Sequence, residues 1–455
     1  MSETQGHLVP TLGLTSIVVF GLSYMAPVIV VSTFGVIATT SHGAAPTAYL
    51  VATLAMTLTG LSYAKMSRTY PASGSVYTYA RKLLGSRIGF LAGWTILLDY
   101  FFLPMAAWLI ESLYLNVQFS VLPVWGWLIV VIAASTLVNI LGIVIADKVN
   151  KVLLGLTTLG LLAIVTVCLH HIAATPPAHV AHALWNPATS IGAITAAAAI
   201  AAYSFLGFDA VSTLSEEVRD AKRNVPRGIV LTVIIGGTIF VFISLLMQWV
   251  HPGATFADES TAGYEVANLA GGEHFANITN AIGLLGGFAS CVAIQASTSR
   301  LMFVMGRDNV LPRRIFGYLH PKFRTPVFNL ILIAAVGMLA VKLSLAVATS
   351  FINFGAFLAF TLVNICVITA WNRHRDNRSE RSILTWIALP AAGAAIDLYL
   401  ITQLSRTAIL LGITWLILGV VYLAIITRGL RQPPPEYNPD SAAEMVPSAR
   451  TDKST

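Results

Sequence analysis

Two aspartates lie in the middle of long apolar segments, where a charged side chain needs a chemical reason. Asp99 lies in GWTILLDYFFLP and Asp209 in AYSFLGFDAVSTLSEE, and no Lys or Arg lies at comparable depth. A carboxylate at the centre of a bilayer costs roughly 2.5–3.5 kcal/mol on insertion scales, so such an acid predicts a function. Each acid must be protonated, paired with a bound cation, or hydrogen-bonded by hydroxyls and backbone amides. A structural acid is the alternative to a proton relay or an amine-binding group.

Aromatic side chains cluster around these two acids in the sequence. Aromatic faces together with a carboxylate can bind an organic ammonium through cation–π attraction and an ion pair. Packing of an apolar core also employs aromatic residues, and the two interpretations carry about equal weight. The residues concerned are Tyr24, Tyr100 to Phe102, Tyr203, Phe205 and Phe208.

Two of the apolar segments contain a helix-breaking residue at mid-length. Pro27 lies between Gly21 and Gly35, and Gly207 precedes Asp209. A proline inside a helix removes one backbone hydrogen bond and clashes with the preceding turn. Transporters place substrate at such breaks in a pair of equivalent helices, although Gly and Pro also simply bend membrane helices. The spacing of the two breaks predicts a five-plus-five inverted repeat followed by two added helices.

The composition is that of a protein that lies mostly in lipid. Hydrophobic residues make up 56% of the 455 positions and charged residues 10%, against roughly a quarter charged in a soluble domain. Because a spanning segment must satisfy its own backbone hydrogen bonds, the fold class is an all-α polytopic membrane protein. The net charge of +7 belongs to short basic loops and not to a nucleic-acid site. No metal cluster, cofactor motif or nucleophile–base pair is present, so an enzyme is not expected.

The apolar segments have the length that spans a bilayer, and they predict about twelve transmembrane helices. Cys168, Cys291 and Cys366 fall inside them without paired spacing and are expected to be core residues. The predicted spans are 12–38, 45–67, 88–117, 121–143, 150–173, 190–214, 228–250, 276–305, 326–342, 346–371, 384–404 and 407–428.

Basic residues fix the predicted orientation, because Lys and Arg stay in cytoplasmic loops. Of the 27 Lys and Arg residues, only Lys342 and Arg406 fall on the other side. Segment 251–274 has four acids and no Lys or Arg, and is therefore expected outside. Both termini are predicted to be cytoplasmic, with no signal peptide. Residues 1–11 form an N-terminal cytoplasmic segment, 12–428 the membrane domain and 429–455 a disordered tail.

Several motifs resemble one known family along nearly the whole span region. These motifs are YPASGSVYTYA, LLDYFFLPM, FLGFDAVSTLSEE, MGRDNVLPRRIFGYLHPKFRTP and FINFGAF. The chain resembles the amino acid–polyamine–organocation permeases, and within them the bacterial putrescine importers. The resemblance implies the leucine-transporter fold, location in the bacterial inner membrane, and alternating access usually driven by a proton gradient.

The resemblance also implies a substrate site between the first and sixth spans. By position, the site would take residues from span one (Tyr24, Met25, Ala26 and Pro27), from span three (Asp99 and Tyr100), and from span six (Tyr203, Phe205, Gly207, Phe208 and Asp209).

One position departs from the pattern. The similar importers have an acid in span one, in a run like F-D-T-F-G, where this chain has Ser32 before Thr33. A diamine has two ammonium groups, so the lost acid removes one natural partner and makes a monoamine or an amino acid credible. Sodium coupling also stays open, because Ser297 and Thr298 could help to hold that ion.

The leading hypothesis is a proton-coupled importer of a putrescine-like amine. An amino acid or monoamine permease, or an exchanger of the same fold, is the alternative; a channel or receptor is less favoured. Asp397 is expected to be structural. Glu216 and Glu217 could form either an inner gate or a solvated ion pair.

Overall fold

The computed structural model describes residues 12–70, 75–141, 147–215, 218–307, 311–323, 325–373 and 382–434. Within these ranges the chain is helical, with one isolated β-bridge between Leu12 and Val218. Nine described helices are long and apolar enough to cross a membrane, and the bent α1–α2 pair raises the number to ten. A multi-pass helical membrane protein is therefore confirmed. Segments 1–11 and 435–455 and the pair Glu216 and Glu217 lie outside the described residues.

The helices follow the predicted apolar segments, with two short helices between them. The long elements are α1 (Leu14–Met25), α2 (Ile29–Thr40), α3 (Ala45–Thr69), α5 (Ser86–Gln118), α6 (Val124–Ile140), α7 (Asp147–Ala174), α8 (Ile191–Ala201), α9 (Ala221–Val250), α10 (Ala262–Arg307), α12 (Val327–Gly337), α13 (Leu345–Arg373), α14 (Leu389–Gln403) and α15 (Arg406–Ile426). The short ones are α4 (Ser75–Leu84) and α11 (Arg313–Phe316).

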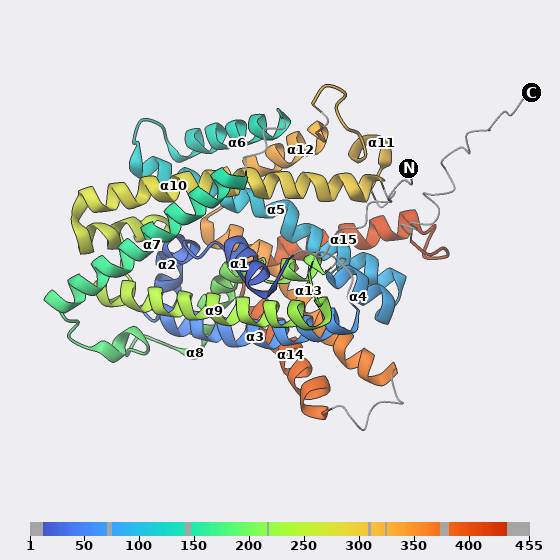
Figure 1. Ribbon diagram of the computed structural model, residues 1–455, viewed down its shortest axis with the longest axis horizontal. Coiled ribbons are helices and arrows are strands. Elements are labelled where there is room, and N and C mark those ends of the chain that lie inside the picture. Colours follow the sequence, from blue (N-terminus) through green and yellow to red (C-terminus); the bar gives the residue numbers. More distant parts are fainter. Residues whose placement is uncertain are drawn as a thin grey trace, which may run out of the picture.

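The helices pack into one bundle whose two ends carry different connections. In Figure 1, α4 and α11 lie at one end and the connection from α7 to α8 at the other. Helix α3 packs along α9, and α5 packs against α10, α6 and α13. Large apolar side chains such as Leu54 and Leu410 are more than half exposed. Such a surface is stable when lipid covers it.

Both predicted breaks are present. Helix α1 ends at Met25, Ala26 takes a left-handed conformation (φ 46°), and α2 leaves at a bend of 50°. Helix α8 ends at Ala201 and continues as the 3₁₀ turn η2 (Ala202–Phe205); after Gly207 (φ 109°), a second 3₁₀ segment, η3 (Asp209–Leu214), follows. A φ of 109° is one that only glycine adopts readily, which explains the residue at this corner.

Helix α15 is fastened to α5 by a reciprocal pair of indoles. Trp94 Nε1 donates to the Trp415 carbonyl at 2.9 Å, and Trp415 Nε1 donates to the Trp94 carbonyl at 3.0 Å. The rings stack with centroids 4.9 Å apart. A side chain at Gly419 would overlap Trp94, so the glycine permits the close approach.

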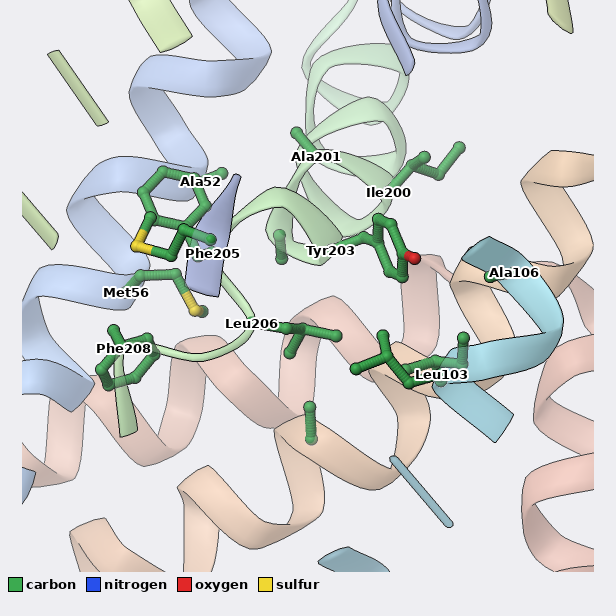
Figure 2. Close-up of a cluster of buried hydrophobic side chains, with 14 of the residues drawn as sticks. Ala52, Met56, Leu103, Ala106, Ile200, Ala201, Tyr203, Phe205, Leu206 and Phe208 are labelled. Atoms are coloured by element: carbon green, nitrogen blue, oxygen red, sulfur yellow. The ribbon is translucent and has the colours of Figure 1, made fainter. Parts of the chain in front are cut away.

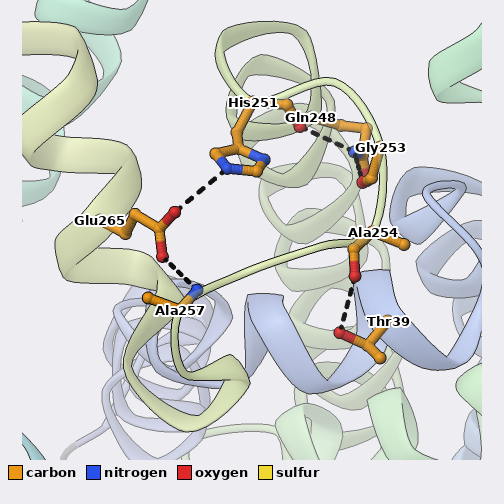
Figure 3. A network of polar contacts seen from close by, with 7 residues as sticks. All are labelled: Thr39, Gln248, His251, Gly253, Ala254, Ala257 and Glu265. Atoms are coloured by element: carbon orange, nitrogen blue, oxygen red, sulfur yellow. Dashed lines mark hydrogen bonds and ion pairs between the residues drawn. The ribbon is translucent and has the colours of Figure 1, made fainter.

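Segment 251–274 was expected to be a loop, but α10 already begins at Ala262 and is interrupted at Gly272 (φ 81°). The shorter stretch 251–261 is held by the polar contacts drawn in Figure 3. Glu265 accepts from the Ala257 amide at 3.0 Å and contacts His251 at 3.3 Å. Thr39 of α2 donates to the Ala254 carbonyl at 3.3 Å. These contacts attach 251–261 to both α2 and α10.

Candidate functional site

A cavity of about 160 Å³ opens beside the α1–α2 break. Its walls come from the end of α1, the start of α2, η2, α5 and α10, with one residue from α7. The lining carries no Lys, Arg or His, and most of it is apolar. Five of the residues predicted for the site line it: Tyr24, Met25, Ala26, Ser32 and Tyr203.

Two of the predicted site residues lie in the apolar core instead. Phe205 and Phe208 are fully buried and are not part of the cavity lining. Phe205 packs edge-on against Phe240 at 5.1 Å, and Phe208 packs against Phe360 at 5.2 Å. Figure 2 shows Phe205 near α3 while the Tyr203 hydroxyl points toward α5. The turn between α8 and η3 thus sends neighbouring aromatic side chains in different directions.

The two intramembrane aspartates lie near each other, and neither of them lines the cavity. Asp209, at the start of η3, is 7% exposed, and its carboxylate lies within hydrogen-bonding reach of its own backbone amide and those of Gly207 and Ala210. Asp99 lies one turn before the cavity-lining Leu103 on α5, and its Oδ1 is buried without a hydrogen-bond partner among the described residues. The two carboxylates interact electrostatically. Break amides therefore satisfy Asp209 in part, whereas Asp99 keeps an unpaired oxygen.

Two tyrosines join these acids to the break. Tyr24 interacts electrostatically with both aspartates and lies within hydrogen-bonding reach of the Tyr100 hydroxyl. A Cβ on Gly207 would overlap the Tyr24 ring, so the two broken segments touch at this point. The structure thus brings Tyr24, Asp99, Tyr100, Gly207 and Asp209 into one cluster. Pro27 shapes the break but does not line the cavity.

A further acid was missed by the sequence analysis. Glu111 of α5 is 5% exposed and lines the cavity. It lies inside the predicted span 88–117, in WLIESLY, where an acid within an apolar run is itself the signal that could have found it.

Two further polar side chains, Thr298 and Asp397, bear on other expectations. Thr298 donates to the Tyr100 carbonyl at 2.7 Å and to the Ile294 carbonyl at 2.9 Å, so its hydroxyl ties α10 to α5. Asp397 is fully buried and accepts from Thr59 at 2.9 Å and from Asn364 at 3.0 Å. These bonds link α14 to α3 and α13, in agreement with a structural role for Asp397.

A helical bundle in which two interrupted segments meet beside an internal cavity, with an acid at one of the breaks, is the architecture of a secondary transporter. The chain belongs to the amino acid permease family, whose model matches residues 12–435.

Three relatives illustrate the range of the family. The chain is 37% identical to the low-affinity putrescine importer PlaP of Escherichia coli K12, an alignment that covers 94% of this chain and 96% of the relative. It is 28% identical to the branched-chain amino acid permease BcaP of Bacillus subtilis, over 84% of this chain and 85% of the relative. It is 26% identical to the methylthioribose transporter of the same species, over 87% and 88%. The chain is thus a transporter and not an enzyme.

Proposed function

We propose that this protein imports a small organic amine of the putrescine type across the bacterial inner membrane, driven by protons. The observation that carries this proposal is the meeting of Asp99 and Asp209 at the junction of the two broken segments. Two carboxylates that interact electrostatically, beside a cavity whose lining has no Lys, Arg or His, favour a cationic substrate. Similarity to PlaP over nearly the whole chain supports the same substrate class.

The cavity walls suit the rest of such a molecule. Apolar side chains from α5 and α10 line the cavity between the α1–α2 break and the first turn of α10, which follows the 251–261 stretch. This space fits a methylene chain. The rings of Tyr24 and Tyr203 supply aromatic surface on which a cation is attracted electrostatically. An unpaired carboxylate such as Asp99 is also the group that can exchange a proton during transport.

An amino acid or monoamine permease, or an exchanger, is the second candidate. Ser32 lines the cavity where the similar importers carry an acid, so the lining lacks that charge. Val28 and Ile29 at the start of α2 also line it, and helix N-terminal amides can hold a carboxylate. Similarity to BcaP is consistent with this candidate.

The proposal includes twelve spans in a five-plus-five inverted repeat with cytoplasmic termini, in which 12–428 is the membrane domain. The shorter apolar helices α6 and Val327–Lys342 supply the two spans beyond ten. Helices five spans apart in the chain pack as pairs: α3 with α9, α5 with α10, and α6 with α12. The broken segments cross, since α1 contacts η3 and α2 contacts α8. A two-fold relation between the halves accounts for these pairings.

Transport assays on purified protein in proteoliposomes test the substrate class. Radiolabelled putrescine, butylamine and leucine are offered with and without an inward proton gradient, and with sodium replaced by choline. We expect saturable, gradient-stimulated uptake of an amine. Uptake of leucine alone would refute the amine proposal in favour of the second candidate, and a strict sodium requirement would refute proton coupling.

A further inference from the structure

Glu111 lies in the cavity wall with no charge partner. Within the described ranges, its carboxylate has no hydrogen bond or ion pair, although the side chain is 5% exposed. A Cβ on Gly287 of α10 would overlap Glu111 Oε2, so the glycine makes room for the carboxylate. The buried Cys291 thiol is its electrostatic neighbour. A buried acid without a partner must either be protonated or pair with a cation, and the cavity beside Glu111 gives a cation access to the carboxylate.

Ser32 lies on the same cavity and is joined to the neighbourhood of Glu111. Tyr114, three residues beyond Glu111 on α5, donates to the Val31 carbonyl at 3.4 Å and lies within hydrogen-bonding reach of the Ser32 hydroxyl. Positions three apart on a helix lie on one face, so Glu111 and Tyr114 face α2 and α10 together. Ser32, Glu111 and Tyr114 therefore line one continuous part of the cavity.

Glu111 is too far from the aspartate pair to share one small diamine with it. It follows Asp99 by twelve residues on the same helix, or about 18 Å at 1.5 Å per residue. A four-carbon diamine has five single bonds of about 1.5 Å between its nitrogens, and cannot exceed roughly 7.5 Å. The cavity lining runs along α5 from Leu103, one turn beyond Asp99, to Tyr114, a distance of roughly 16 Å.

We propose that Glu111, with Ser32 and Tyr114, forms a second site for one ammonium group, between the 251–261 end and the Asp99–Asp209 cluster. This inference rests on the proposed function and adds a separate binding step to it. The ligand class is an organic amine, whose ammonium pairs with Glu111 while its methylene chain lies along the apolar wall. The first part of α10 closes this site, since Gly263 and Tyr264 line the cavity and Tyr264 donates to Asn277 across the Gly272 interruption at 2.7 Å.

Equilibrium binding of radiolabelled butylamine and putrescine to the purified full-length protein tests the proposal. We expect two classes of amine-binding site in the wild type. Glu111→Gln should raise the Kd of the first class at least about thirtyfold, and Asp209→Asn should remove the second class. Glu111→Gln should raise the Kd of butylamine and the Kd of putrescine at this site by the same factor, because a single ammonium group binds there. The double variant Glu111→Gln/Ser32→Asp should recover this site, because the charge returns to the same cavity.

Two glycine variants guard against loss of folding as an explanation. Gly287→Ala keeps the charge but displaces the carboxylate, so it should weaken the Glu111 class alone. Gly155→Ala on α7, where a Cβ meets nothing within 4 Å, is the matched control and should bind as the wild type does.

The outcomes separate this inference from the proposed function. A single class of amine site, removed by Asp209→Asn and unchanged by Glu111→Gln, would overturn the second site and leave the amine importer standing. Absence of amine binding in the wild type would overturn the proposed function itself. If Glu111→Gln abolished only a sodium dependence, Glu111 would hold an inorganic cation, and the inference would also be wrong.

Discussion

Gly207→Ala is the change that bears most directly on the junction of the two broken segments. Gly207 has a φ of 109°, a conformation that costs a non-glycine residue about 1–3 kcal/mol. The added methyl group would also overlap the Tyr24 ring, and relief of such overpacking costs typically another 1–3 kcal/mol. We therefore expect a loss of stability between about 2 and 6 kcal/mol, together with weaker amine binding because Tyr24 lines the cavity.

The measurement is thermal unfolding of the detergent-purified protein, followed by amine binding on the folded fraction. Gly192→Ala on α8 is the matched control, since a Cβ there meets nothing within 4 Å and alanine favours a helix. A double-mutant cycle with Tyr24→Ala separates the two contributions. In the Tyr24→Ala background, Gly207→Ala should cost only the free energy of the backbone strain, because the ring that the methyl group would overlap is gone. If Gly207→Ala unfolds and binds like Gly192→Ala, the reasoning about this junction is wrong.

Three further predictions concern charge, orientation and packing. Asp209→Asn should abolish saturable amine uptake while the protein level in the membrane is unchanged; uptake at the wild-type rate would remove Asp209 from the transport mechanism. A cysteine at Ser260 should react with an impermeant thiol reagent in intact cells, because the 251–261 stretch is expected outside; labelling only after lysis would reverse the orientation. Asp397→Ala should lower stability by about 1–3 kcal/mol, since the buried Thr59 and Asn364 lose their acceptor. Its substrate preference in competition assays should stay that of the wild type, and a changed preference would contradict a structural role.

The sequence predicted the breaks well because backbone chemistry encodes them locally. Proline at 27 and glycine at 207 restrict or permit particular backbone angles wherever they occur, and both breaks appear at those positions. That Asp99 and Asp209 share one neighbourhood was implied only by the family resemblance, because nothing local in the sequence brings their two spans together.

The direction of individual side chains was less predictable. Phe205 and Phe208 were assigned to the site with Tyr203, yet the 3₁₀ turn and Gly207 direct them into the core. Glu111 carried a local signal, an acid within an apolar run, but the space that Gly287 leaves for its carboxylate could not be predicted from the sequence. Contacts between distant segments of this kind have no local signal.

The indole pair between Trp94 and Trp415 has a mechanical consequence for a protein of this class. Alternating access requires one group of helices to rock against another around the substrate. Two reciprocal hydrogen bonds and a glycine-mediated close approach join α15 to α5. We therefore expect α15 to travel with α5 as one rigid body. The last helix then serves as a brace for the wall that carries Asp99 and Glu111, and the broken segments supply the moving part.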